Sequence, residues 1–207
     1  MSRRSKSSGR WLREHFDDPY VQRAQQEGWR SRAAFKLQEL DSAERLIFPG
    51  AVIVDLGAAP GGWSQYAART LNGRGTVIAV DLLAMDQLPG VSILRGDIRE
   101  HEVLDSLLKL VSGRRVDLVM SDMAPNMSGV DVVDQARAAN LEALALDLAR
   151  KLLGPEGTLV MKLFQGAGFQ ELLADVRRSF RQVRVRKPRA SRQRSPEAYL
   201  VARKPRA

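Results

Sequence analysis

The chain has 207 residues, of which 44% are hydrophobic and 28% are charged, and this length predicts one domain with a single sizeable core. Cysteine is absent, which excludes a disulfide framework, cysteine-ligated zinc and thiol catalysis. The two histidines, His15 and His101, leave little for a histidine-rich metal site or a Ser-His-Asp triad, so we expect no bound metal.

Positive charge is concentrated at the two ends of the chain. The formal net charge is +9, yet residues 177–207 contain 12 Lys and Arg and a single acid, Glu197. That segment sums to +11 and leaves −2 for residues 1–176, although the first ten residues add four more bases: Arg3, Arg4, Lys6 and Arg10. A basic tail that only increases solubility is one explanation, but segregated charge favours a face that binds a polyanion.

The beginning of the chain is polar and basic and lacks the apolar core of a signal peptide. No apolar run approaches the roughly 18 residues that a membrane span needs. We therefore expect a cytoplasmic protein that does not enter a membrane. Residues 1–10 are predicted to form a disordered basic arm, and residues 11–207 a single domain.

The first predicted helix covers residues 31–46, with Ser31 as its cap and a loose apolar face. Lys36 lies beside that face. Taken alone, Lys36 would be interpreted as an ordinary surface lysine.

The next stretch has the pattern of a strand, a tight turn and a helix. Val52–Leu56 is a strand, residues 57–62 are small, and a helix is predicted at Trp63–Leu71. Small residues let the backbone approach a ligand closely, although such a loop can also be a mere connection. Ala59 stands where the G-x-G-x-x-G fingerprint needs glycine, so the loop favours a nucleoside-type ligand over a pyrophosphate.

The rest of the chain alternates as βαβ units do. Further strands are predicted at residues 76–81, 92–94, 116–121, 158–163, 182–186 and 199–202, and further helices at 102–112, 132–153 and 170–180. This pattern predicts an α/β fold with a doubly wound, seven-stranded, mostly parallel sheet and helices on both faces. The last connection is too short for a crossover helix, so the last strand should run antiparallel.

Parallel strands end at one edge of a sheet, and several acids lie at these ends. Asp81 is placed to accept both ribose hydroxyls of a nucleoside, and Asp97 lies one strand further out, where an adenine amino group would be. Each could instead be a helix cap or turn acid. Trp63 could pack over the ligand or lie in the core.

The same edge should also receive the basic end of the chain. An antiparallel last strand begins there, which brings Glu197 close to Asp122 and Lys162 at the ends of two other strands. The preceding loop carries Arg189, Arg192 and Arg194, which should lie at the rim of the pocket. Basic charge beside a cleft suits a nucleic-acid substrate.

Six stretches carry a resemblance to a known family: VDLGAAPGGWSQ, VDLL, GDI, SDMAPNMSG, KLFQGAGF and VRKPRASRQRSPEAYLVA. Together they resemble the FtsJ/RrmJ-like S-adenosylmethionine-dependent ribose 2′-O-methyltransferases, whose fold is a Rossmann-like class I methyltransferase. The likeness covers nearly the whole chain from Arg10 onward. It is strongest to bacterial members, which methylate a uridine in 23S ribosomal RNA of the large subunit.

The resemblance implies a catalytic tetrad and a cofactor site. The family's Lys-Asp-Lys-Glu tetrad falls on Lys36, Asp122, Lys162 and Glu197. The S-adenosylmethionine positions fall on Gly61, Trp63, Asp81, Asp97 and Asp122. The 2′-hydroxyl would attack the sulfonium methyl group in line, with Lys162 taking the hydroxyl proton or only orienting the hydroxyl. Asp122 would orient Lys162, while Lys36 and Glu197 would hold the ribose.

Other functions stay open at this point. A nicotinamide-dependent oxidoreductase would fit the fold class, with Tyr66 and Tyr199 as the candidates to exclude, but no clear Tyr-Lys pair or relay histidine is present. A non-catalytic RNA-binding or ribosome-assembly module is a second alternative, and transfer RNA is an alternative substrate. We expect a monomer that acts on ribosomal RNA within the assembled large subunit.

Overall fold

A computed structural model describes residues 18–206, with gaps at 126–127, 167 and 193. The predicted basic arm therefore lies outside the described residues. The helices are α2 (Pro19–Gln26), α3 (Ala33–Glu44), α4 (Gly62–Leu71), α5 (His101–Val111), α6 (Asp131–Leu152) and α7 (Phe169–Ser179). The strands are β1 (Val52–Leu56), β2 (Thr76–Asp81), β3 (Val91–Arg95), β4 (Val116–Ser121), β5 (Leu153–Phe164), β6 (Phe180–Arg186) and β7 (Glu197–Pro205).

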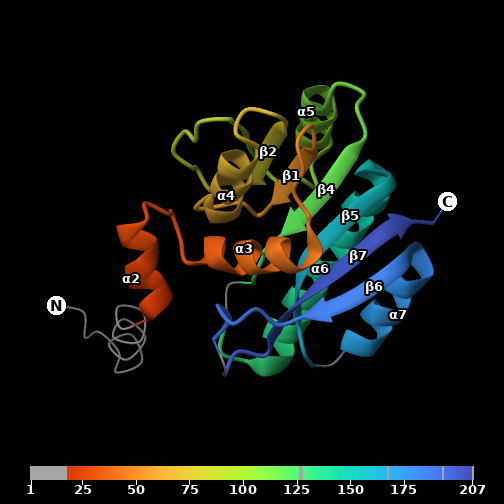
Figure 1. Ribbon diagram of the computed structural model, residues 1–207. Helices are drawn as coiled ribbons and strands as arrows, with labels where there is room; N and C mark the ends of the chain where they lie inside the picture. Colours follow the sequence, from red (N-terminus) through yellow and green to blue (C-terminus); the bar gives the residue numbers. More distant parts are fainter. Residues whose placement is uncertain (1–17, 126–127, 167, 193, 207) are drawn as a thin grey trace.

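The seven strands form one sheet in the order β3-β2-β1-β4-β5-β7-β6 (Figure 1). Strands β1 to β5 pair in parallel, whereas β7 runs antiparallel to both β5 and β6. The seven-stranded, mostly parallel sheet with an antiparallel last strand is confirmed. The order reverses between β1 and β4, and ligands bind at such a switch point in open α/β sheets.

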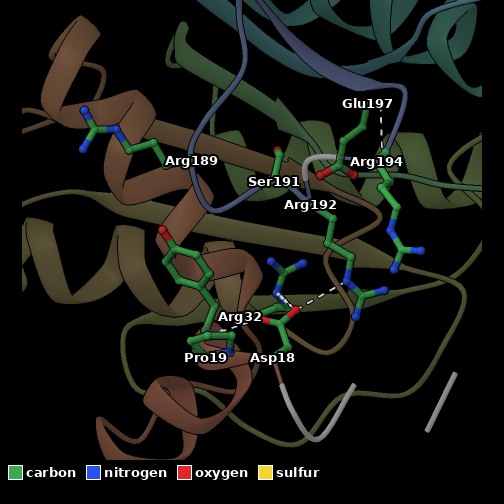
Figure 2. Close-up of a pocket in the computed structure, with 10 residues that line it drawn as sticks. Asp18, Pro19, Arg32, Arg189, Ser191, Arg192, Arg194 and Glu197 are labelled. Atoms are coloured by element: carbon green, nitrogen blue, oxygen red, sulfur yellow. Dashed lines mark hydrogen bonds and ion pairs between the residues drawn. The ribbon is translucent and has the colours of Figure 1, made fainter. Parts of the chain in front are cut away.

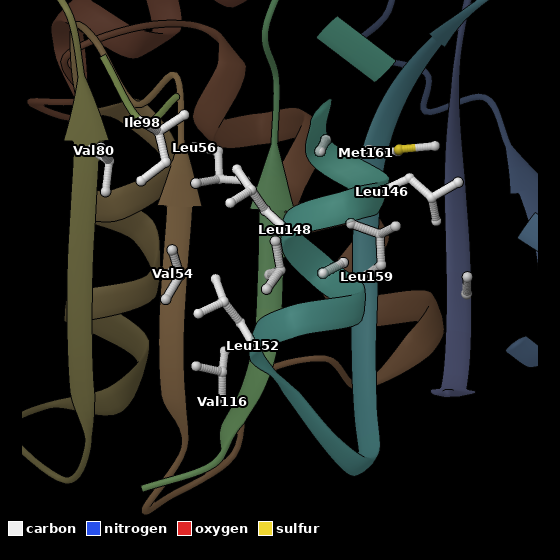
Figure 3. Close-up of a cluster of buried hydrophobic side chains, with 14 of the residues drawn as sticks. Val54, Leu56, Val80, Ile98, Val116, Leu146, Leu148, Leu152, Leu159 and Met161 are labelled. Carbon is white, nitrogen blue, oxygen red and sulfur yellow. The ribbon is translucent and has the colours of Figure 1, made fainter. Parts of the chain in front are cut away.

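Alternate residues of each strand face opposite helix layers, as the two-residue period of a strand requires. Val52, Val54 and Leu56 of β1 pack in the cluster that includes α5, α6 and α7, and α6 runs along the strands beside β4 and β5 (Figure 3). Ile53 faces the other way, into the cluster formed with α3 and α4. Helices therefore cover both faces, as predicted.

The last three strands are longer than the sequence pattern predicts. β5 begins at Leu153, because this residue still pairs with Val116 across a register shift before the regular pairing resumes at Thr158. Pro155 lies in this irregular part, where proline is tolerated. β6 and β7 are longer than predicted because they pair with each other over their length, from Phe180 opposite Pro205 to Arg186 opposite Tyr199. None of the helices in the described part of the chain is long and apolar enough to cross a membrane.

Candidate active site

The four tetrad residues converge at the carboxyl edge of the sheet. Lys36 comes from α3, Asp122 follows β4, Lys162 lies in β5 and Glu197 begins β7. The antiparallel pairing sets Lys162 opposite Tyr199 and Phe164 opposite Glu197. Lys162 alternates with Met161 and Leu163, which face the α6 layer, so its side chain projects to the α3 side, where Lys36 lies.

A continuous chain of polar contacts joins these side chains. Lys36 Nζ lies 2.8 Å from Glu197 Oε1 and donates to the Tyr199 hydroxyl at 3.0 Å. That hydroxyl donates to Asp122 Oδ1 at 2.7 Å. Lys162 Nζ contacts the same Oδ1 and also donates to the Asp122 backbone carbonyl, both at 2.8 Å. The order is therefore Glu197, Lys36, Tyr199, Asp122, Lys162.

The cluster is largely withdrawn from water. Lys36, Lys162 and Glu197 are buried, Tyr199 is fully buried, and the Asp122 side chain is 19% exposed. Charged groups tolerate burial only when they are paired and hydrogen-bonded, and here two ammonium groups face two carboxylates. The pairing explains how the fold can hold these charges, and the burial makes their electrostatic effects stronger than they would be in water.

Electrostatics set the protonation of two members. Burial raises the pKa of the Asp122 carboxyl, but Lys162, Lys36 and the hydrogen bonds from Lys162 and Tyr199 outweigh burial and lower it below its ordinary value. Burial, followed by the Asp122 and Glu197 carboxylates, raises the pKa of Tyr199 well above its ordinary value. Near neutral pH, Asp122 is thus an anion that accepts hydrogen bonds, and Tyr199 keeps its proton.

Tyr199 is the member of this cluster that the tetrad pattern does not assign. In the sequence it is a candidate only for an oxidoreductase. Its spacing could have indicated its place, because residues two apart on a strand share a face and Tyr199 is two after Glu197. Spacing does not predict that the Tyr199 hydroxyl connects Lys36 with Asp122 by hydrogen bonds, because these two residues come from other elements.

The loop between β1 and α4 forms the candidate cofactor edge. Gly57 and Gly61 have φ of 69° and 103°, a region that favours glycine. Asp81, at the end of β2, accepts from Ala59 N at 2.8 Å and from Leu83 N at 2.7 Å. Each carboxylate oxygen keeps a further lone pair, so ribose hydroxyls could still donate to Asp81. A Cβ on Gly57 would meet Met123, so this loop adjoins the segment after Asp122.

Two other predicted cofactor residues have defined surroundings. The Trp63 indole is buried in the core, where its N–H donates to the Ala33 carbonyl at 2.8 Å and its ring packs against Tyr199. The indole therefore lies in the core and does not pack over the ligand. Only the backbone of Trp63 remains available to contact a cofactor. Asp97 accepts from Arg99 Nε at 2.9 Å, and this side-chain hydrogen bond lowers the pKa of Asp97.

The three predicted RNA-binding arginines lie in the loop 187–196, called here the basic loop. Arg189, Arg192 and Arg194 line a pocket of about 980 Å³ together with Arg32 and Glu197 (Figure 2). Glu197 belongs to both the pocket and the tetrad, so the pocket opens beside the buried charges. Within the described residues, no group of three or more His, Asp or Glu side chains could hold a metal ion.

Fold and site together define a class of protein. A mostly parallel sheet with an antiparallel last strand, a glycine loop after β1 and a Lys-Asp-Lys-Glu cluster at the carboxyl edge describe a Rossmann-like methyltransferase. Residues 29–205 match the family described as FtsJ-like methyltransferase. The chain belongs to that family.

Relatives and solved structures agree with this assignment. A ribosomal RNA large subunit methyltransferase E from Chromohalobacter salexigens is 58% identical over 97% of this chain and 96% of its own. One from Legionella pneumophila is 54% identical and covers 97% of both chains. A crystal structure named for a Plasmodium falciparum ribosomal RNA methyltransferase superposes with a TM-score of 0.77 at 26% identity, over 85% of this chain and 98% of its own. Human methyltransferase-like protein 13, in complex with SAH, shares the fold with a TM-score of 0.56 at 18% identity, over 83% and 79%.

Proposed function

We propose that this protein transfers the methyl group of S-adenosylmethionine to the 2′-hydroxyl of a ribose, a uridine in 23S ribosomal RNA. The observation that carries the proposal is the buried chain from Glu197 to Lys162, which lies beside a pocket lined by arginines. The names of the relatives support ribosomal RNA of the large subunit as the substrate.

S-adenosylmethionine would supply an electrophilic methyl group on a sulfonium. In this proposal Asp81 accepts the ribose hydroxyls, and Asp97 holds the adenine amino group. Gly61 and the backbone of Trp63 approach the cofactor, and Asp122 contacts its methionyl end. The left-handed conformation at Gly61 and the free lone pairs on Asp81 suit this binding.

Lys162 orients the attacking hydroxyl. Its Nζ donates to the Asp122 carboxylate and to the Asp122 backbone carbonyl, each at 2.8 Å, and these two contacts fix the direction of the side chain. The Lys162 side chain would donate a hydrogen bond to the 2′-oxygen of the ribose. This bond would keep a lone pair of that oxygen directed at the methyl group. As the methyl group passes from the sulfonium to the 2′-oxygen, the hydroxyl proton would leave to solvent water through the open pocket beside Glu197. Lys36 and Glu197 hold the ribose in place, and positioning of this kind can supply much of the rate enhancement.

RNA would enter through the pocket side. Arg189, Arg192 and Arg194 supply positive charge next to Glu197, where the ribose has to lie. We propose that the assembled large subunit is the substrate and that a monomer acts on it in the cytoplasm, where subunits are assembled. We also propose that residues 11–207 act as one methyltransferase domain.

Two measurements test the function. Mapping of 2′-O-methyl sites in RNA from cells with and without the protein should show one uridine of 23S ribosomal RNA losing its methyl group. The purified protein should transfer a labelled methyl group to large subunits prepared from the cells that lack it. Transfer to transfer RNA in place of ribosomal RNA would contradict the proposed substrate, and cofactor binding without any transfer would contradict catalysis.

A further inference from the structure

The pocket contains an acid that the proposed function does not use. Asp18 is buried at the start of α2, where Oδ1 accepts from Tyr20 N at 3.0 Å and caps the helix. Its other oxygen, Oδ2, lies 3.1 Å from Arg32 Nε and 3.4 Å from Arg192 Nε. Figure 2 shows both guanidinium groups converging on this one carboxylate.

The two arginines are held very differently. Arg32 donates to the Ala190 carbonyl at 2.5 Å, lies over the Tyr20 ring, and its side chain is only 16% exposed. Arg192 comes from the basic loop, is 39% exposed, and makes the longer contact with Asp18. Asp18 itself is buried, but it keeps its contact with Arg32 when Arg192 leaves, so no buried charge is left unpaired. Arg192 can therefore exchange its partner at small cost, whereas Arg32 is a fixed cation.

A buried hydroxyl beside these arginines lacks a partner. Ser191 lines the same pocket and is 4% exposed, and within the described part of the chain its Oγ has no hydrogen bond. Leaving a buried donor unsatisfied is costly, and native structures rarely do so without a ligand or water. Its backbone is fixed, because Ser191 N donates to the Pro188 carbonyl at 3.0 Å and Ala190 N donates to Glu39 at 2.9 Å.

We propose that Ser191, Arg32 and Arg192 form a binding site for one phosphodiester of the RNA strand and that Asp18 occupies part of it as an internal competitor. This inference rests on the proposed function, since Glu197 at the same pocket holds the target ribose. The phosphate next to that ribose has two non-bridging oxygens. They accept from Ser191 Oγ and the two guanidinium groups, while Arg192 leaves Asp18. Asp18 thus keeps the arginines in place before RNA binds and opposes non-productive anions.

Two substitutions test the site with a fluorescein-labelled, single-stranded oligoribonucleotide of mixed sequence, in a titration repeated over a range of salt concentrations. Asp18→Asn keeps a helix-capping residue but removes the competing charge. It should tighten binding about 3- to 10-fold at low salt and steepen the salt dependence, because Arg192 is then free to release counterions. Ser191→Ala should weaken binding about tenfold without changing the salt slope, because a hydroxyl releases no counterions.

Matched controls separate the site from general effects. Asp147→Asn removes a carboxylate on α6 that lies 3.2 Å from Arg150, which keeps its contact with Asp175, and Ser106→Ala removes a hydroxyl on α5. Binding by both controls should equal that of the wild type. The proposed role of Asp18 as a competitor would be overturned if Asp147→Asn raised RNA affinity as much as Asp18→Asn does. It would also be overturned if Asp18→Asn lowered RNA affinity. Unchanged binding by Ser191→Ala would overturn the phosphate site. Methyl transfer to large subunits is measured separately. If the wild type binds the oligoribonucleotide but transfers no methyl group, the proposed function is wrong, and the binding titrations still decide whether the phosphate site exists.

Discussion

At the scale of single residues, the buried charges are arranged so that each has an opposite partner on at least one side. Lys36 lies between Glu197 and the Tyr199 hydroxyl, and Asp122 lies between that hydroxyl and Lys162. Removing one member of such a chain leaves a buried charge unpaired, which costs more than the pair itself contributes. Substitutions in the chain must therefore be checked for folding before their kinetics are interpreted.

Lys162→Ala should abolish methyl transfer while cofactor and RNA binding stay close to wild type, because its contribution is made mainly in the transition state. Single-turnover transfer to large subunits and calorimetry with S-adenosylmethionine measure the two effects. Near-normal turnover would remove Lys162 from the mechanism.

The variant Lys162→Arg distinguishes the two roles of the lysine. Arginine can orient a hydroxyl but cannot accept its proton. Since Lys162 is held as a hydrogen-bond donor by the Asp122 carboxylate and carbonyl, an orienting role is expected, and Lys162→Arg should keep measurable turnover. Complete loss in a folded, cofactor-binding arginine variant would instead make Lys162 the proton acceptor.

Asp81→Ala should lower the affinity for S-adenosylmethionine roughly 10- to 100-fold. The reason is the loss of charge-assisted hydrogen bonds to the ribose, worth about 1.5–3 kcal/mol. Calorimetry measures the change, with Asp86→Ala on the same exposed segment as the control. Unchanged affinity in a folded Asp81→Ala protein would refute this assignment.

At the scale of helices and strands, sequence patterns located the elements that local periodicity defines. The glycine loop, the strand ends and the antiparallel β7 follow from spacing and connection length, and so does the meeting of Lys162, Asp122 and Glu197 at one edge. The start of β5 does not follow from the sequence pattern, because Leu153 is held by a non-local pairing with Val116.

The surroundings of individual side chains were harder to predict for the same reason. The Trp63 indole is fixed by the Ala33 carbonyl on another element, and Asp18 meets Arg192 across 174 positions of sequence. Periodicity places a residue on a face, but it carries no information on which distant group will complete its hydrogen bonds.

The basic loop acts as one element, and its prediction concerns all three arginines together. Replacing Arg189, Arg192 and Arg194 by alanine should weaken RNA binding and flatten its salt dependence by nearly one unit of slope for each phosphate that the loop no longer neutralises. Cofactor affinity should hardly change, because Asp81 and the glycine loop lie outside this pocket. An unaltered slope would mean that these arginines are only solvated surface.

At the scale of the whole molecule, one sheet carries both halves of the proposed site. The glycine loop lies after β1 and the tetrad spans β4, β5 and β7 on the other side of the switch point. Helix α3, which carries Lys36, is tied to the far strands because Glu44 at its end contacts Arg184 and Arg186 of β6. Global stability and the geometry of the site are therefore linked through the sheet.

The buried Asp55 makes this stability depend on pH. It lies at the end of β1, accepts from Ser64 Oγ at 2.6 Å, and burial raises its pKa from 3.8 to about 7. The folded state therefore holds this proton more tightly than the unfolded chain does. The contribution is fully present below about pH 4 and is lost as the pH rises through about 7. Glu142, with a pKa also raised to about 7 by burial, acts in the same direction.

Asp55→Asn should remove the Asp55 part of this dependence, because asparagine can still accept from Ser64 but does not titrate. From about pH 5 to about pH 8, the wild type should lose about 2–3 kcal/mol more unfolding free energy than the variant. Urea denaturation of both proteins at the two pH values measures this difference directly, and Glu142 contributes equally to both. If the two proteins lose the same amount, Asp55 is already ionised in the folded protein, and the burial of β1 does not control its proton.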